Sequence, residues 1–174
     1  MPAREPTETT NLDTLYGSKT MPWSHPRDLL DGGALVGPAA HCVLGTVRPD
    51  GRPHAAAVGG AWYDGDVYFQ TGPATRKARN VAADPACTVA ASLPGLDLVF
   101  EGEARRVTDA PTLEAIAAIY REAGWPVRVE GDAFTAPYSA PSGGPPPWHL
   151  FRVTSHTVFA VAGAAPYGAT RWRF

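Results

Sequence analysis

Glycine and proline limit what this chain can fold into more than any other residue types. The 174 residues include 18 glycines and 18 prolines, whereas average usage supplies about 12% for the two together. Both interrupt regular structure, glycine through its free backbone and proline through its missing N–H. The sequence has no collagen-like period and no low-complexity run, so these residues indicate turns. We therefore expect short elements, mostly strands, with frequent turns between them.

The charge balance argues against a dedicated nucleic-acid or membrane-surface protein. Lys and Arg number 15 against 17 Asp and Glu, a formal net charge of −2, which is too near neutral for either class. The balance favours a small-molecule or a protein ligand, and a small-molecule substrate is the expected partner. No stretch approaches the roughly 18 consecutive apolar residues of a membrane span, and the first 20 residues carry neither an apolar run nor a basic leader. The sequence therefore predicts a cytoplasmic protein without nucleic-acid or membrane partners.

The pattern along the chain indicates one domain behind a short arm. Residues 1–25 are polar and broken by prolines, which predicts an extended N-terminal arm, and 26–174 are expected to form a single domain. Periodicity predicts helices after Pro26, over 74–83 and after Asp109, and strands over 41–48, 53–63, 67–71, 87–93, 96–107, 148–153 and 157–162. Six or seven short strands in adjacent hairpins favour a mainly β fold with helices, namely an antiparallel β-barrel.

Turn residues mark the connections in this barrel. Asp64-Gly65 stands between alternating apolar residues and predicts a hairpin, because both central turn positions need a positive φ. A loop over 125–147, proline-rich from 137 to 147, is too long for a plain connector, so we expect it to cover a site or reach a partner. Bends in the barrel wall are expected at the glycines inside strand patterns: Gly45, Gly59, Gly60 and Gly102.

The stretch with the most chemical information lies at the start of the second predicted helix. Thr71 ends a strand, Gly72-Pro73 forms a turn, and Thr75 stands at the expected N-cap, followed by Arg76, Lys77 and Arg79. Cations are unfavourable at the positive end of a helix, but a bound phosphate would explain them, since helix N-termini already favour anions. The alternative is a solvated basic face whose cations pair with Asp84 or Asp66.

From this motif outward the chain resembles a known family. Arg52-Pro53-His54, the run 68–71, the run 75–80 and Asp84-Pro85 are similar to the pyridoxamine 5'-phosphate oxidase-like split-barrel superfamily, and the ending over 170–174 is similar to that of many actinobacterial members. The superfamily includes enzymes that use FMN and enzymes that use the deazaflavin coenzyme F420. The resemblance implies a split β-barrel of the FMN-binding type and a homodimer whose cofactor sites are built from both subunits.

The resemblance also implies which residues hold the cofactor. Its ring system would lie along the second strand, its phosphate would be held at the helix start, and the end of the third strand would flank it; these positions are His54, Ala55, Ala56, Ala57, Val58, Gln70, Thr71, Thr75, Arg76 and Lys77. The small side chains agree, because they let a flat ring approach the backbone. The arginine that pyridoxamine-phosphate oxidases carry on the second strand falls in the alanine run here, so true vitamin B6 oxidase activity is not expected.

The predicted function is therefore a flavin- or deazaflavin-dependent oxidoreductase. We expect a coenzyme F420-dependent reductase that transfers hydride to a hydrophobic or conjugated small molecule, since extra cations such as Arg79 suit the longer anionic tail of F420. The alternatives are an FMN-dependent pyridoxamine 5'-phosphate oxidase-like oxidoreductase and a non-catalytic protein that binds F420 or FMN. No catalytic acid or base is assigned; the candidate proton donors are Tyr68, Tyr120, Tyr138 and His54.

Two further assignments concern metals and aromatic residues. No histidines have metal-ligand spacing, and the adjacent His41 and Cys42 point to opposite faces of a strand, so no metal site is predicted. An aromatic residue between two arginines at a chain end indicates docking. Trp62, Arg171 and Trp172 are therefore assigned to a substrate pocket or a subunit interface.

Overall fold

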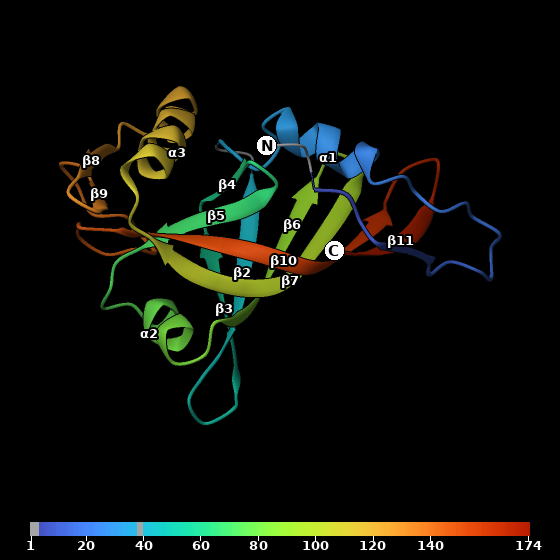
Figure 1. The fold of residues 1–174 in the computed structure, drawn as a ribbon, viewed down its shortest axis with the longest axis horizontal. Helices are drawn as coiled ribbons and strands as arrows, with labels where there is room; N and C mark the ends of the chain where they lie inside the picture. The colour runs from blue at the N-terminus through green and yellow to red at the C-terminus, as the bar shows by residue number, and fades with distance from the viewer. Residues whose placement is uncertain (1–3, 38–39) are drawn as a thin grey trace.

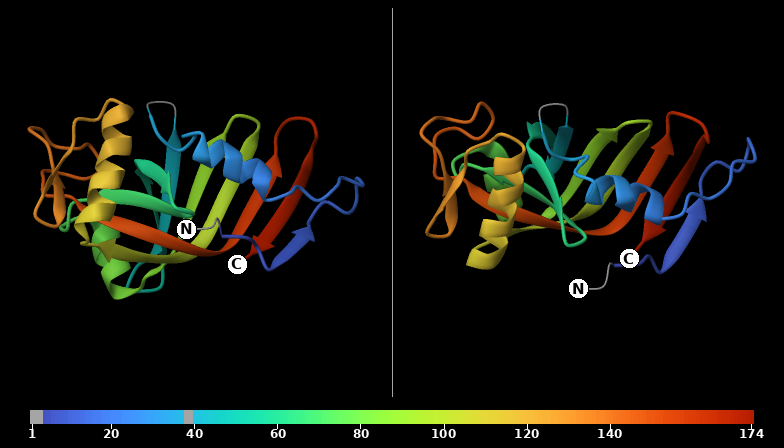
Figure 2. Two further views of the ribbon diagram at one scale, coloured as in Figure 1. Left: turned by 45° about the horizontal axis from the view of Figure 1, so that its top comes forward. Right: turned by 90° about the horizontal axis from the view of Figure 1, so that it is seen from above.

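The computed structural model describes residues 4–37 and 40–174. Within them, nine strands form one antiparallel sheet in the order β1-β11-β10-β7-β6-β2-β3, with β5 also paired to β10 and β4 paired to β5. The sheet curves strongly but does not close, and β3 is an edge strand (Figures 1 and 2). The strands are β1 (Glu8–Asn11), β2 (His41–Val47), β3 (Pro53–Val58), β4 (Gly60–Tyr63), β5 (Asp66–Thr71), β6 (Ala86–Leu93), β7 (Leu96–Val107), β10 (His149–Ala162) and β11 (Gly168–Arg173).

This arrangement confirms the mainly β, antiparallel fold class but corrects the number of strands. The predicted strand 53–63 is two strands separated at Gly59: β3 pairs with β2, whereas β4 pairs with β5. Glycine is needed beside this break, because a Cβ on Gly60 would lie 2.6 Å from Cys42 Sγ. The chain thus leaves one part of the sheet and joins another, which opens the barrel between β3 and β5.

The predicted strands 148–153 and 157–162 are one continuous strand, β10. The polar pair Ser155-His156 was expected in a turn, but the register shifts between Ser155 and Thr157 instead, which is a β-bulge. The bulge lies opposite Gly102, where a Cβ would collide with the Thr154 carbonyl oxygen. Gly102 therefore marks a bend, as its position in the strand pattern predicts.

Three helices pack around the sheet in the described chain: α1 (Ser24–Asp31), α2 (Arg76–Ala83) and α3 (Ala110–Glu122). Side-chain caps begin two of them: Thr75 accepts from the Ala78 N–H of α2, and Asp109 accepts from the Thr112 N–H of α3. Helix α1 starts before Pro26 rather than after it. The turn between β4 and β5 has the predicted positive φ at both Asp64 and Gly65.

The buried side chains form two clusters. The larger cluster lies between the concave face of the sheet and α1, and its centre includes Leu30, Leu44, Phe69, Phe100 and Trp172. The smaller cluster lies under α3 and includes Leu113, Ile116, Tyr120, Phe134 and Trp148. Strands β8 (Arg128–Glu130) and β9 (Ala133–Thr135), within the predicted loop, form a small second sheet at this end.

Part of the predicted N-terminal arm joins the main sheet. Strand β1 pairs with β11 along four residues, from Glu8 opposite Arg173 to Asn11 opposite Thr170. The first and the last strand of the described chain therefore lie side by side. Over residues 4–37 and 40–174, no helix is both long and apolar enough to cross a membrane.

Candidate functional site

Hydroxyl groups organise the turn between β5 and α2. Thr71 is fully buried at the end of β5, and its hydroxyl lies 3.0 Å from that of Thr75. The Thr75 hydroxyl also lies 2.9 Å from the Gly72 carbonyl, to which it donates, and accepts a longer bond from the Ala78 N–H at 3.4 Å. Helix α2, eight residues long, therefore begins beside two threonine hydroxyls, and the first N–H groups of a helix have no acceptor within it.

The cations at this helix start have no carboxylate partners. Arg76 is exposed, whereas Lys77 is buried and its Nζ donates to the Ser142 carbonyl at 2.5 Å. Burial lowers the pKa of Lys77. Among the described residues, neither Arg76 nor Lys77 forms an ion pair. Asp66 lies beside Arg152 instead, and Asp84 accepts a hydrogen bond from the Ala86 N–H. The predicted pairing with Asp84 or Asp66 is therefore wrong, and the positive charge is left for another partner.

Strand β3 brings His54 into the same positive field. The pKa of His54 is lowered by partial removal from water, and then by the nearby charges of Arg48, Lys77 and Arg76. Arg48, which directly follows β2, has a buried Nε without a partner. The basic cluster, as we call Arg48, His54, Arg76 and Lys77, thus combines three elements of the fold.

A hydrogen-bonded link fixes α2 against β2 and β3. The Asn80 side-chain amide donates to the Thr46 hydroxyl at 3.0 Å, and this hydroxyl donates to the His54 carbonyl at 3.4 Å. Asn80 is fully buried and Thr46 nearly so. The sequence motif over 71–77 did not identify Thr46, Arg48 or Asn80 as residues of the site. The position of Asn80, one helical turn after Arg76, is the sequence feature that could have indicated it.

The predicted alanine wall forms one side of an open hollow. Ala55 and Ala57 are exposed on the outer face of β3, while His54 and Ala56 are half-buried on the other face. A hollow of about 580 Å³ lies beside this strand and is lined in part by Gly45, His54, Ala55, Thr88 and His156. A Cβ on Gly45 would collide with the Thr88 hydroxyl, so glycine at this position leaves room for the Thr88 side chain.

Gln70 lies in a different cavity from the alanine wall. It lines a space of about 300 Å³ together with Gly59, Gly60 and Tyr120, and its Oε1 is buried without a partner. The Tyr120 hydroxyl donates to the Gly59 carbonyl at 3.2 Å, and burial raises its pKa. Burial likewise raises the pKa of Tyr68, to about 12. Within one chain, the structure does not bring Gln70 and the basic cluster to one surface.

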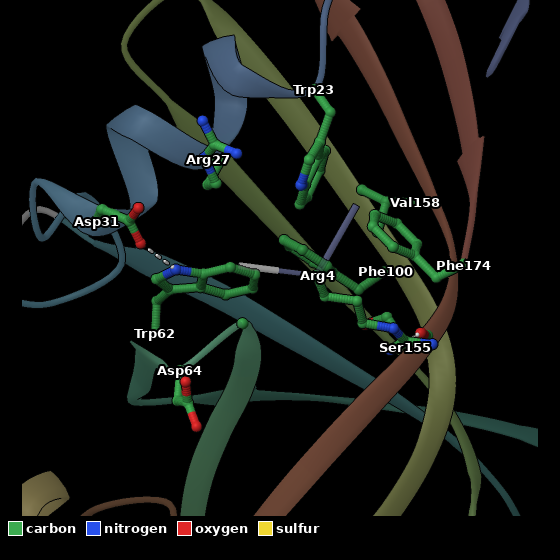
Figure 3. Close-up of a pocket in the computed structure, with 11 residues that line it drawn as sticks. Arg4, Trp23, Arg27, Asp31, Trp62, Asp64, Phe100, Ser155, Val158 and Phe174 are labelled. Carbon is green, nitrogen blue, oxygen red and sulfur yellow. Dashed lines mark hydrogen bonds between the residues drawn. The ribbon is translucent and has the colours of Figure 1, made fainter. Parts of the chain in front are cut away.

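The aromatic residues near the chain end lie away from α2. Trp62 is nearly buried, and its indole N–H donates to Asp31 Oδ1 at 2.7 Å. Trp172 is fully buried in the larger core cluster, with its ring 5.3 Å from that of Trp23. Arg171 pairs with Glu8 at 3.0 Å across β1 and β11. Trp62 lines a cavity under α1 (Figure 3), and none of the three contacts the basic cluster.

The proline-rich loop contacts the helix start directly. Besides the Ser142 bond to Lys77, the Gly143 carbonyl accepts from the Gly72 N–H at 3.1 Å. The Trp148 indole N–H donates to the Gly144 carbonyl at 2.9 Å, which holds the loop to β10. The segment 142–144 therefore packs beside the candidate phosphate site. That the loop covers a site or reaches a partner stays a prediction.

Comparisons with known proteins agree with this geometry. The family model for pyridoxamine 5'-phosphate oxidase matches residues 35–162. An F420 reductase structure superposes with a TM-score of 0.51 at 22% identity, covering 72% of this chain and 92% of its own. General stress protein 26 from Bacillus anthracis str. Sterne gives 0.52 at 16% identity, covering 78% and 93%.

A pyridoxamine 5'-phosphate oxidase-related, FMN-binding protein from Nostoc punctiforme gives a TM-score of 0.50 at 16% identity, covering 77% of this chain and 86% of its own. No curated protein sequence matches. At these identities the structures establish a shared fold, while the family model extends over most of the chain. The chain therefore belongs to the pyridoxamine 5'-phosphate oxidase-like family of FMN-binding split barrels.

Proposed function

We propose that this protein is a coenzyme F420-dependent reductase acting on a hydrophobic or conjugated small molecule. The observation that carries the proposal is the basic cluster: Arg48, Arg76 and Lys77 surround His54 beside the start of α2, and neither Arg76 nor Lys77 pairs with a carboxylate in the described chain. Cations without an ion-pair partner beside a helix N-terminus are an arrangement that favours an anionic group.

The residues present fit a phosphate-bearing flavin or deazaflavin. The Thr75 hydroxyl and the first N–H groups of α2 would face the phosphate, and Arg76 could bind two of its oxygens. Arg48 Nε, buried without a partner, supplies a further donor. The exposed Arg79 stands one turn further along α2, where the longer anionic tail of F420 would extend.

The ring of the cofactor would lie along β3. Ala55 lines the hollow and Ala57 is exposed on the same face of β3, and each presents only a methyl group, so a flat ring could approach the strand backbone. When bound, a flavin or deazaflavin supplies hydride transfer, and the chain supplies position, charge and exclusion of water. His54 is a titratable side chain on the strand of this wall, and its lowered pKa favours the neutral imidazole.

FMN is the second candidate, because the same helix start suits any flavin phosphate and one similar structure is that of an FMN-binding protein. A non-catalytic binding protein would use the same residues. Fluorescence titrations with F420 and with FMN, followed by turnover assays, distinguish the three candidates. Tight F420 binding with turnover supports the reductase, tight FMN binding with turnover supports the FMN enzyme, and tight binding without turnover supports the non-catalytic protein. Protein that binds neither cofactor would refute the proposal.

Matched variants locate the binding site in the same titrations. Arg76→Ala with Lys77→Ala should weaken cofactor binding at least tenfold, because charge-assisted bonds to phosphate contribute about 1.5–3 kcal/mol each. Arg128→Ala removes an exposed arginine from β8 and should leave affinity unchanged. Equal affinity in the double variant would place the phosphate elsewhere.

We also propose a homodimer that forms through the outer face of the sheet. Cross-strand partners Ala57, Val43, Ala90, Val99 and Phe159 form a continuous row there, which we call the outer apolar stripe. Val43 is 44% exposed. The stripe begins on β3, the strand of the alanine wall, so a second copy seated on it would also border the hollow.

A further inference from the structure

A partly open cavity with aromatic walls lies under α1, away from the proposed cofactor site. It has a volume of about 200 Å³ and is lined by residues from α1, β4, β7, β10 and both ends of the chain. Figure 3 shows Trp23 and Trp62 reaching into it from different elements, with Phe100 and Phe174 behind. None of the lining residues belongs to β2, β3 or α2.

The apolar walls of this cavity suit one aromatic ring. The Trp23 and Trp62 rings are 6.5 Å apart at 65°, and the Trp62 and Phe100 rings are 6.1 Å apart. Trp23 also packs edge-on against Phe174 at 5.0 Å. An apolar cavity of roughly 150 Å³ in another protein stays dry and binds benzene. The space here would hold a ring with a short substituent.

Two lining residues have buried polar atoms that find no hydrogen-bond partner among residues 4–37 and 40–174. They are Trp23 Nε1 and Ser155 Oγ, on side chains that are each 6% exposed. The neighbouring Trp62 N–H, in contrast, donates to Asp31. A buried donor without an acceptor lowers the stability of the fold. A ligand with an acceptor atom in this cavity could therefore gain a hydrogen bond from either group.

The charges around the cavity favour a neutral ligand. Arg4 and Arg27 line it together with Asp31 and Asp64. Arg27 already pairs with Glu5 at 2.6 Å, and Arg4 donates to the Ser155 carbonyl at 2.7 Å with its guanidinium over the Phe174 ring. Each guanidinium thus already has an oxygen partner, and Asp31 and Asp64 add negative charge to the lining, so a carboxylate would gain little here and would lose its hydration.

We propose that this cavity is a second ligand site, which binds a small, neutral aromatic compound carrying a carbonyl oxygen. The ring would lie among Trp23, Trp62 and Phe100. The carbonyl oxygen would accept from the Trp23 N–H or the Ser155 hydroxyl. This site is independent of the proposed reductase function, since it shares no residue with the basic cluster.

Fluorine NMR on the intact protein without cofactor tests the site. The probe is 4-fluoroacetophenone; 4-fluorotoluene lacks the oxygen, and 4-fluorobenzoate carries a charge. We expect saturable binding of the ketone, roughly five- to tenfold weaker binding of fluorotoluene from the loss of one hydrogen bond, and no binding of the benzoate. No saturable binding of the ketone, or equal binding of ketone and fluorotoluene, would overturn the proposal.

Two variants tie the signal to the cavity. Ser155→Ala removes a hydroxyl that has no partner, so the free protein should be no less stable while ketone binding weakens. Trp23→Phe removes the indole N–H and keeps an aromatic ring, and should reduce the preference for ketone over fluorotoluene. Ser92→Ala, at an exposed serine of β6, is the matched control. If both cavity variants bind the ketone like the parent protein, or if FMN displaces the ketone, the cavity is not the site.

Discussion

At the scale of single residues, His54 reports the electrostatic field of the candidate phosphate site. Its neutral form is favoured by partial burial and by Arg48, Lys77 and Arg76. Because the folded-state pKa lies below the ordinary value of 6.5, the unfolded chain binds a proton more readily as the pH falls below 6.5. His54 therefore destabilises the fold increasingly as the pH falls from 6.5 to its lowered folded-state pKa, keeps that full destabilising effect at lower pH, and has no such effect well above pH 6.5.

This field makes the pKa of His54 a direct probe of the cluster. Arg76→Ala with Lys77→Ala should raise it toward 6.5, because two of its charged neighbours are removed, and FMN or F420 should raise it in the parent protein by adding a phosphate charge. Titration of the histidine ring protons by NMR measures both effects. His149, whose pKa is lowered mainly by burial and then by Arg106, is the internal control and should not move. A constant His54 pKa would mean that the cations do not face β3.

Helix caps and tight turns were predictable from the sequence, because each requires one of a few residue types at a fixed backbone position. Thr75 and Asp109 cap their helices and Asp64-Gly65 forms the turn, as predicted. The burial of Lys77 was not predictable, because it depends on Ser142, which is 65 positions away. The roles of the predicted cofactor residues stay predictions, since their test is a bound cofactor.

At the scale of elements, the proline-rich loop and the α2 turn form one unit. The Gly72 N–H donates to the Gly143 carbonyl, and a Cβ on Gly72 would collide with that carbonyl oxygen. Together with the Ser142 bond to Lys77, this contact holds the loop beside the helix start. The loop thus limits both the space and the donors available to a ligand phosphate.

Gly72→Ala should separate these two elements. Forcing a methyl group into backbone contact costs about 1–3 kcal/mol, which should lower the free energy of unfolding in urea and expose segment 137–147 to limited proteolysis. Cofactor affinity should change as well, because Lys77 loses its carbonyl partner. Gly163→Ala is the matched control, since a Cβ there meets nothing within 4 Å. If both variants are as stable as the parent protein, the loop is not docked through Gly72.

The strands show why element boundaries were harder to predict than element types. The antiparallel fold class followed from alternation and turns, but the predicted break at Ser155-His156 is a bulge inside β10, and the predicted continuity over 53–63 is broken at Gly59. Both depend on partner strands: Gly102 lies opposite the bulge, and Cys42 crowds Gly60. Such pairing across the sheet is not encoded in the local pattern.

At the scale of the whole molecule, the curved sheet separates two kinds of surface. Its concave face holds the larger core cluster, α1 and the aromatic cavity. Its outer face carries the hollow beside β3 and the outer apolar stripe. Residues next to the stripe along the same strands are buried in the core, such as Leu44 beside Val43 and Phe100 beside Val99. Because neighbouring strand residues alternate between faces, the side chains of the stripe point outward.

The outer apolar stripe therefore makes the oligomeric state a test of the proposed dimer. Val99→Glu places a carboxylate in the middle of the stripe, where a subunit contact would bury it without a partner. We expect a dimer for the parent protein and a monomer for Val99→Glu by light scattering, with an unchanged circular dichroism spectrum because Val99 faces away from the core.

Leu15→Glu is the control for added charge alone, since Leu15 is 84% exposed and outside the stripe; this variant should remain a dimer. Cofactor affinity separates a dimer that completes the site from one that does not. Because the hollow adjoins the stripe along β3, the Val99→Glu monomer should bind FMN and F420 more weakly than Leu15→Glu does. A parent protein that is monomeric at every concentration, or a Val99→Glu variant that remains a dimer, would show that the second copy does not sit on this face.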